Sequence, residues 1–197
     1  MQNCKLDVSN SLNEFKNNFR TPKPISIRIG YEWAESNPRN DERWKFLKNV
    51  TGNILKSLEQ QKNARKKNFK FCYQLGRMRA KHGCELISRF VELCNETDIL
   101  IFDISMANPN VMFEMGVAVA IKGVKSGRVF IMCEGDHGKV KIPSDISGYF
   151  ITYYKKTAGN FKLADYSGFQ AALKTALLDV AFEKQMWGNE KSEINSD

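Results

Sequence analysis

Histidine and paired cysteine are scarce in this 197-residue sequence, which excludes two common ways of stabilising a small protein. Only two histidines are present, and the five cysteines are odd in number and widely spaced, with no Cys-x-x-Cys pair. A structural zinc site or a disulfide framework is therefore not expected. Such cysteines fit a reducing, cytoplasmic setting, in which most of them are buried as small apolar side chains.

Long apolar runs are also missing from the sequence. No stretch reaches the roughly 18 residues of a membrane span, and the polar N-terminus lacks the apolar centre of a signal peptide. We therefore expect no membrane association. Hydrophobic residues still make up 42% of the chain, which is enough for a full core. We predict an N-terminal arm over residues 1–23, one α/β domain over residues 24–187 and a polar tail over residues 188–197.

Positive charge is concentrated in one stretch of a chain whose net charge is +8. The basic side chains there are Lys62, Arg65, Lys66, Lys67, Lys70, Arg77, Arg79 and Lys81. Such a stretch attracts phosphates, either those of a nucleotide or those of a nucleic acid. A solvated helix end and loop is the alternative explanation, so a nucleic-acid partner for Lys62 to Lys81 is an open hypothesis.

Strand and helix patterns alternate along the chain. Apolar or alternating runs predict strands at residues 25–30, 69–75, 99–104, 128–133 and 149–154. Helical spacing of apolar residues predicts helices at 41–61, 83–95 and 166–187, and a further helix that is capped by Asn110 and ends at Lys122. This order predicts a single α/β domain with an open, mainly parallel, five-stranded sheet and helices on both faces. Ligands of such folds bind outside the carboxyl ends of the strands.

Glu114 is the only charged residue between residues 111 and 121, which are otherwise apolar or glycine. This composition predicts a helix that is hydrophobic on every side and therefore buried. Burying an unpaired carboxylate is costly or raises its pKa, so a protein keeps such a group mainly where it performs chemistry. The alternative is a structural acid paired with an arginine, such as Arg28 of the first strand.

A second acid, Asp103, ends the most apolar strand, so two carboxylates flank one strand-to-helix turn. Asp103 could instead be a strand-end residue that bonds to the backbone near Asn110. Five further residues end or follow strands at the same edge and are candidate substrate contacts: Gly30, Glu32, Trp33, Asn108 and Asn110. The two asparagines have an alternative role as turn and cap residues only.

Residues 103–120, D-I-S-M-A-N-P-N-V-M-F-E-M-G-V-A-V-A, resemble a segment of nucleoside 2-deoxyribosyltransferase-like proteins and related TIR-like predicted nucleotide-binding domains. The first-strand signature of those families has only a loose counterpart, I-S-I-R-I-G-Y-E-W at residues 25–33. The resemblance implies a flavodoxin/TIR-like fold and N-glycosidic chemistry. In deoxyribosyltransferases an acid at the Glu114 position attacks the anomeric carbon of a nucleoside, and an acid at the Asp103 position helps to handle the base or sugar. In TIR-type enzymes a glutamate in a comparable pocket cleaves NAD, and several members are toxic effectors in bacterial antiphage systems.

These observations lead to one leading hypothesis and two rivals. The leading one is an enzyme that cleaves or transfers at the N-glycosidic bond of a nucleoside, nucleotide or NAD, with Glu114 as nucleophile or electrostatic stabiliser and Asp103 as the assisting acid. No metal or cofactor is expected, and NAD enters only as a substrate. The rivals are a non-catalytic nucleotide-binding sensor and a nucleic-acid-associated protein. A homo-oligomer or a regulatory protein partner is a further expectation.

Overall fold

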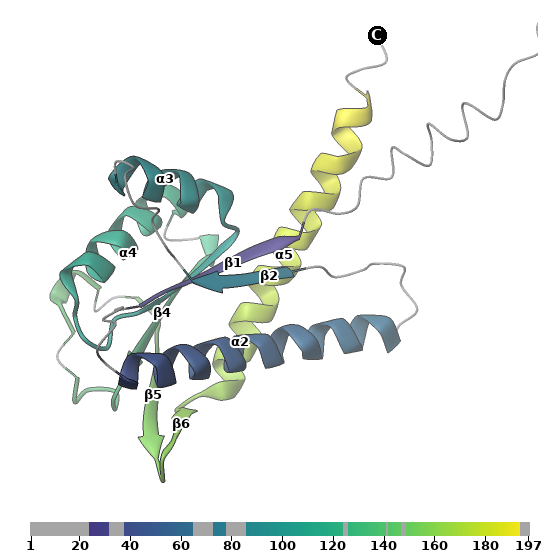
Figure 1. Cartoon of the computed structure of the whole chain (residues 1–197). Helices are drawn as coiled ribbons and strands as arrows, with labels where there is room; N and C mark the ends of the chain where they lie inside the picture. Colours follow the sequence, from purple (N-terminus) through teal and green to yellow (C-terminus); the bar gives the residue numbers. More distant parts are fainter. Residues whose placement is uncertain are drawn as a thin grey trace, which may run out of the picture.

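The computed structural model describes residues 24–31, 38–64, 73–77, 86–123, 126–140, 142–146 and 149–193. They form a single α/β domain with helices on both faces of a six-stranded sheet, whose strand order is β2-β1-β3-β4-β5-β6 (Figure 1). The strands are β1 (Ile25–Gly30), β2 (Tyr73–Arg77), β3 (Ile99–Asp103), β4 (Val129–Glu134), β5 (Ile151–Thr157) and β6 (Asn160–Leu163). The helices are α2 (Pro38–Ala64), α3 (Leu86–Glu96), α4 (Pro109–Lys122) and α5 (Tyr166–Glu193), with a short 3-10 helix, η2 (Ser144–Ile146).

The predicted open, mainly parallel sheet of flavodoxin/TIR-like type is confirmed, with one strand more than expected. Strands β1 to β5 pair in parallel, and β6 pairs antiparallel with β5. Ala158 and Gly159 form the turn between β5 and β6, with φ values of 50° and 84°. Two positive φ angles match the twist of the flanking strands. Ala-Gly is a weaker hairpin signal than Asn-Gly, so the sequence did not reveal β6.

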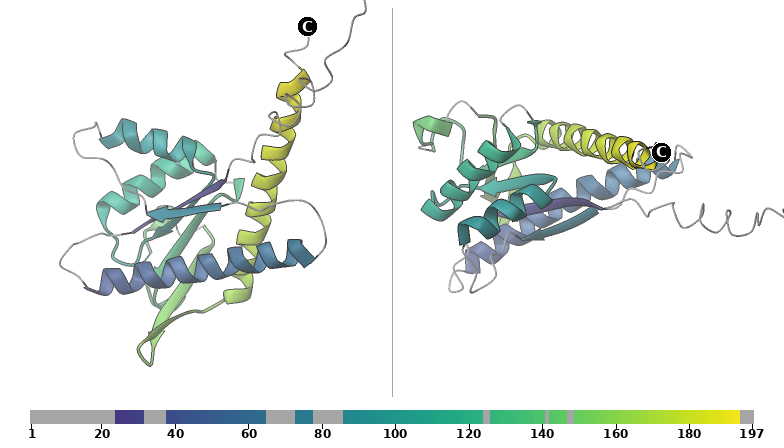
Figure 2. Two further views of the ribbon diagram at one scale, coloured as in Figure 1. Left: turned by 45° about the vertical axis from the view of Figure 1, so that its right-hand side comes forward. Right: turned by 90° about the horizontal axis from the view of Figure 1, so that it is seen from above.

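Two cores lie on opposite faces of the sheet. Helices α2 and α5 cover one face and helices α3 and α4 cover the other (Figure 2). Every residue of the central strand β3 is buried. Ile101 packs in the α2/α5 core and Phe102 in the α3/α4 core, because successive side chains of a strand point to opposite faces. By the same alternation, Asp103 points toward α2 and α5.

Several element boundaries differ from the predicted ones. Strand β2 lies at residues 73–77 rather than 69–75, and α5 continues to Glu193, through the start of the predicted polar tail. The predicted N-terminal arm and most of the basic stretch fall outside the described residues. No described helix is both long enough and apolar enough to cross a membrane.

Helix α4 is not buried on every side, so that part of the prediction was wrong. Val111, Met115 and Ala118 face the core, whereas the side of α4 that carries Phe113 meets solvent, and Phe113 is 54% exposed. The physical reason is the position of α4 in an outer layer. The sheet covers one side of it and α3 packs on another. An all-apolar composition could not indicate which side would stay open.

The described cysteines are core residues. Cys94 on α3 and Cys133 on β4 are free and buried, and burial raises the pKa of each thiol to about 11. Both are therefore protonated at neutral pH and do not act as nucleophiles. Cys4, Cys72 and Cys84 lie outside the described residues.

Candidate functional site

The loop between β3 and α4 lies at the carboxyl edge of the parallel strands, and Asn108 ends it as the N-cap of α4. The Asn108 side-chain oxygen accepts hydrogen bonds from the backbone N–H groups of Asn110 (2.9 Å) and Val111 (3.4 Å). Asn110 was predicted as the cap, but the cap lies two residues earlier, at Asn108. Pro109 is the reason: proline suits the first helical position, which makes the residue before it the cap. Asn110 is an exposed residue of the first turn.

Glu114 is half-buried on α4, and burial raises the pKa of its carboxyl group. Within the described ranges, no hydrogen bond or ion pair reaches this carboxylate, and the alternative of a pair with Arg28 is not found. The Glu114 charge helps to raise the pKa of the Cys94 thiol, which places the carboxylate on the flank of α4 that faces α3. Glu114 is thus a partly desolvated acid, and none of the described residues neutralises it with an ion pair.

Asp103 is buried, and both of its carboxylate oxygens accept hydrogen bonds. Its side chain is 5% exposed. The Tyr154 hydroxyl donates to Oδ2 at 2.7 Å, and the backbone N–H of Ser105 donates to Oδ1 at 3.1 Å. The Ser105 hydroxyl also donates to Oδ1. Burial raises the pKa of Asp103 in spite of these bonds, which lower it. The predicted alternative, a bond to the backbone near Asn110, is not formed.

The structure does not bring the two predicted acids together. Asp103 contacts Tyr154 of the α2/α5 core, whereas Glu114 lies on the helix that covers the opposite face. Ser105 links Asp103 to the end of β4. Its hydroxyl group donates to Asp103, and its hydroxyl oxygen accepts the backbone N–H of Glu134 at 2.7 Å. These bonds tie the loop that starts α4 to the end of β4 and the middle of β5.

An arginine–glutamate cluster beside Asp103 was not predicted from the sequence. The buried Arg43 of α2 donates to Glu134 Oε2 from Nε at 3.0 Å and from Nη2 at 2.6 Å, and Arg39 Nη2 donates to Oε1 at 2.5 Å. Burial alone would raise the pKa of Glu134, but the hydrogen bonds from the arginines outweigh it, and the net shift is downward. The sequence did contain a signal for a buried Arg43. Asn40, Arg43 and Leu47 recur at helical spacing, so they lie on the side of α2 that faces the core.

A cleft of about 470 Å³ opens beside this cluster. Its lining residues are Arg39, Arg43, Ser105, Met106, Glu134, Gly135, Lys155 and Lys156. The cleft is rich in cations, but Lys155 pairs with Asp136 (3.0 Å) and Lys156 with Glu42 (2.6 Å), so these lysines neutralise neighbouring acids. Among the described residues, in this cleft or outside it, no three His, Cys, Asp or Glu side chains lie close enough together to bind a metal ion.

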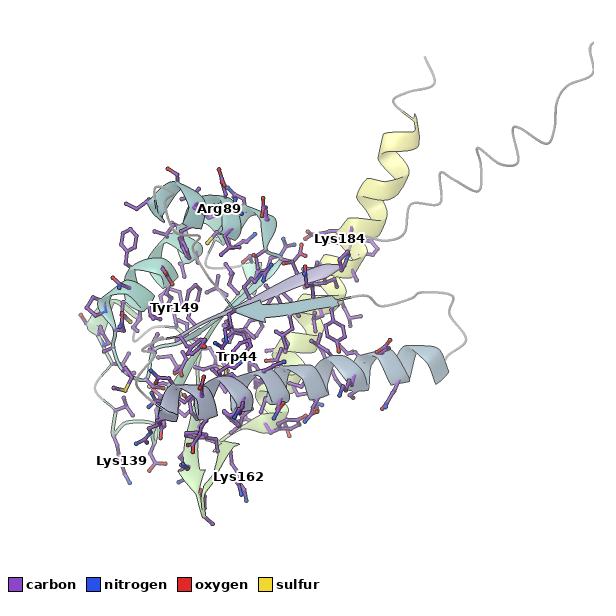
Figure 3. The ribbon with its side chains drawn as sticks, viewed as in Figure 1. Trp44, Arg89, Lys139, Tyr149, Lys162 and Lys184 are labelled. Atoms are coloured by element: carbon purple, nitrogen blue, oxygen red, sulfur yellow. The ribbon has the colours of Figure 1, made fainter. Side chains whose placement is uncertain are left out.

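The end of β1 leads into an aromatic stack on the α2 side of the sheet. Gly30 is buried beside Phe102 of β3. The next residue, Tyr31, stacks on Trp44 of α2 with ring centroids 5.7 Å apart, and the Arg77 guanidinium lies 4.7 Å from the Trp44 ring centre. Trp44 lies where α2 meets the sheet (Figure 3). The predicted contacts Glu32 and Trp33 fall outside the described residues.

Removing the Tyr154 hydroxyl tests whether Asp103 holds the loop. We expect Tyr154→Phe to destabilise the protein by about 1–3 kcal/mol, because a buried carboxylate loses a donor that no water can replace. Urea unfolding measures this loss. Tyr153→Phe, on the opposite face of the same strand, is the matched control, and an equal cost for both variants would contradict the role given to Asp103.

The fold is an α/β fold of flavodoxin/TIR-like type. Residues 81–156, less than half of the chain, match the family model described as "CAP12/Pycsar effector protein, TIR domain". This match spans α3, β3, α4, β4, η2 and all but the last residue of β5, and it contains both Asp103 and Glu114. The TIR-like part of the resemblance is therefore supported, and its deoxyribosyltransferase part stays a prediction.

Two further comparisons add little to this assignment. No curated protein matches the chain. Among solved structures, a mutant of the flavo di-iron protein from Thermotoga maritima aligns with a TM-score of 0.42 and 16% identity, over 88% of this chain and 41% of that one. The chain thus spans less than half of that protein, and the likeness is too weak to carry an argument.

Proposed function

We propose that this protein cleaves an N-glycosidic bond of NAD or of a related nucleotide, with the Glu114 carboxylate facing the anomeric carbon. The observation that carries the proposal is the half-buried Glu114 without a cation partner in the described structure. Its place in a TIR-like segment supports the same role. Water or a second base would accept the sugar, giving hydrolysis or transfer.

Cleavage of an N-glycosidic bond is assisted by one negatively charged group close to the anomeric carbon. Breaking an N-glycosidic bond builds positive, oxocarbenium-like charge on the sugar, and a nearby carboxylate stabilises that charge or captures the sugar covalently. The stabilisation is larger where water is partly excluded, because the local dielectric is lower. A carboxylate held by an arginine would already be neutralised, which is why it matters that Glu114 has no ion pair among the described residues.

NAD suits this site better than a neutral nucleoside does. Nicotinamide leaves NAD as a neutral molecule, so its departure needs no proton, whereas a neutral nucleoside requires an acid to protonate the leaving base. Asp103 is poorly placed for that task, since both of its oxygens accept internal hydrogen bonds. We therefore propose Asp103 as a positioning residue that fixes the loop before α4.

Of the predicted substrate contacts, Asn110, Asn108 and Gly30 lie at the same edge of the sheet as the start of α4. Exposed Asn110 is the best placed to reach a substrate, and Asn108 contributes by capping the helix that carries Glu114. The family description names an effector protein. We propose on that basis that NAD or nucleotide depletion serves antiphage defence.

The direct test incubates the full-length protein with NAD, with nucleotides and with nucleosides, and measures released base by chromatography. Wild type is compared with Glu114→Gln, and a second base added in excess separates transfer from hydrolysis. Equal behaviour of the two proteins on every substrate would reject the enzyme. Melting stabilised by NAD without turnover would identify a sensor instead, with about 2.7 kcal/mol gained at a 100-fold excess over Kd.

The pH dependence of the reaction distinguishes Glu114 from Glu134 as the acid that carries it. Burial raises the pKa of Glu114, so protonation should remove the active carboxylate as the pH falls through a value above the ordinary 4.5. The pKa of Glu134 is shifted downward from the same ordinary value of 4.5. We expect the acid limb of a kcat profile to lie above 4.5, and a limb below it would point to Glu134.

A further inference from the structure

Arg28 is a charged residue in the middle of a central strand. It lies on β1, between β2 and β3. Its neighbours Ile27 and Ile29 pack in the α2/α5 core, so Arg28 points to the other face, which α3 and α4 cover. Central strands of parallel sheets are normally apolar on both faces, and arginine is rarely buried unless it is paired. The fold alone does not account for this residue.

The Arg28 side chain has no partner in the described part of the chain. No hydrogen bond or ion pair reaches it there, and its Nε is buried without an acceptor. Leaving a guanidinium partly desolvated and unpaired is unfavourable. An arginine in this condition is typical of a site that awaits an anion.

The adjacent strand leaves room for the guanidinium group. Arg28 lies opposite Gly76 in the β1–β2 register, and a Cβ atom on Gly76 would collide with Nη1 of Arg28. The side chain therefore lies across the backbone of β2, in space that only glycine provides. Gly76 therefore leaves room for the guanidinium on this face of the sheet.

Arg28 and Glu114 lie on the same face of the sheet. Helix α4 packs against β1 as well as β3 and β4, and Glu114 lies on α4. The two side chains carry opposite charges, and no ion pair joins them. A substrate with an anionic group and a sugar that develops positive charge is complementary to such an arrangement.

We propose that Arg28 binds a phosphate group of the substrate whose glycosidic bond faces Glu114, which makes the substrate a phosphorylated nucleotide rather than a free nucleoside. The inference rests on the proposed function and adds a residue and a substrate class to it. The planar guanidinium presents donors that match two phosphate oxygens at once. Arg28 is a binding residue in this account, and Glu114 remains the catalytic one.

The test compares substrates that share one glycosidic bond and differ in phosphate: NAD, nicotinamide mononucleotide and nicotinamide riboside. We expect Arg28→Gln to raise KM for NAD and the mononucleotide by about 10–100-fold, the size of a lost charge-assisted hydrogen bond. KM for the riboside should not change. Equal losses on all three substrates, or no loss on any, would overturn the proposal.

Two further variants guard against a purely structural effect. Arg28→Lys keeps the charge but not the planar fork, so partial recovery of KM is expected. Gly76→Ala keeps Arg28 but displaces its guanidinium, and it should reproduce the phosphate-selective loss. If Arg28→Gln fails to fold, Gly76→Ala decides the question by itself, since a wild-type KM ratio between mononucleotide and riboside in that variant would reject the proposal.

A binding measurement separates this proposal from the proposed function. ADP-ribose, which contains the phosphates but lacks the nicotinamide–ribose bond, is titrated calorimetrically into wild type and Arg28→Gln. We expect Kd to rise about 10–100-fold in the variant. If wild type releases no base from any substrate, the proposed function fails, while this titration still reports on Arg28. Unchanged ADP-ribose affinity would reject the phosphate contact even if cleavage is found.

Discussion

Glu114→Gln should abolish base release while the protein stays folded. We expect kcat to fall at least about 10²–10³-fold, the usual cost of removing one group that stabilises transition-state charge. Glutamine keeps the size and shape of the side chain but supplies neither a negative charge nor a nucleophile. The measurement is initial-rate kinetics on NAD with saturating substrate, so that the loss is read in kcat rather than in KM.

The same variant should be slightly more stable than wild type at neutral pH. The folded-state pKa of Glu114 is raised by burial, so the ionised form carries a cost in the folded protein at any pH above that value. This cost disappears as the pH falls through the raised pKa, because the group is then neutral in the folded state. Glutamine removes the cost at every pH. The Tm should therefore rise by a few degrees at pH 7 and match wild type in acid.

The exposed Glu96 of α3 provides a matched control for Glu114. Glu96→Gln should change neither kcat nor Tm measurably, because exposed charges contribute little. Loss of activity in Glu114→Gln accompanied by loss of helical circular dichroism would mean that the residue is structural. Full activity in Glu114→Gln would remove the basis of the proposed function.

Arg43→Ala should have the largest effect on stability, about 3–5 kcal/mol, because it leaves the Glu134 carboxylate partly buried without its main partner. The Arg43 side chain is 5% exposed and that of Glu134 13% exposed. Arg39 binds the same carboxylate but is 55% exposed, so Arg39→Ala should cost at most about 1 kcal/mol. Urea unfolding at pH 7 measures both, and equal costs would contradict this account.

Acidification should reduce the Arg43→Ala effect. The pKa of Glu134 is lowered in the folded protein by hydrogen bonds from its arginines, which outweigh the effect of burial. A lowered folded-state pKa contributes stability above the unfolded value, and that stability is lost as the pH falls through the folded value. The variant lacks most of this contribution. The difference in unfolding free energy between wild type and Arg43→Ala should therefore shrink as the pH falls below the ordinary carboxyl pKa of 4.5.

A double variant tests whether Arg43 stabilises the protein through its ion pair with Glu134. Arg43→Ala/Glu134→Ala removes both charges, so it should be less destabilised than the sum of the two single variants. Strict additivity would show that Arg43 stabilises the protein through packing of its alkyl chain rather than through Glu134.

The position of Glu114 was predictable because it depends on local pattern. An apolar run marks β3, an asparagine–proline turn follows it, and one acid interrupts the apolar helix after that turn. Each signal lies within a few residues of the next, so no long-range contact was needed to interpret it. The exact cap was missed, because Asn108 and Asn110 are equally good caps and only Pro109 distinguishes them.

The partners of Asp103 were not predictable in the same way. Ser105 is a local donor, but the hydrogen bond to Oδ2 comes from Tyr154, which lies far along the chain. Tyr154 reaches Asp103 because β3 and β5 flank β4 on either side in the sheet. The sequence places Asp103 and Glu114 on either side of one turn, and closeness in sequence suggested an acid pair. Strand alternation instead sends Asp103 to the face opposite α4.

By itself, the sequence determined the order of the main helices and strands apart from β6, the parallel sheet and the turn before the helix that carries Glu114, since each follows from periodicity and turn chemistry within a short window. Only the tertiary structure decided which side of α4 stays exposed, which face each acid occupies, and that Arg28 lies over Gly76. These facts depend on which strands pair and which helix covers which face. Such choices join residues distant in sequence, and local patterns do not encode them.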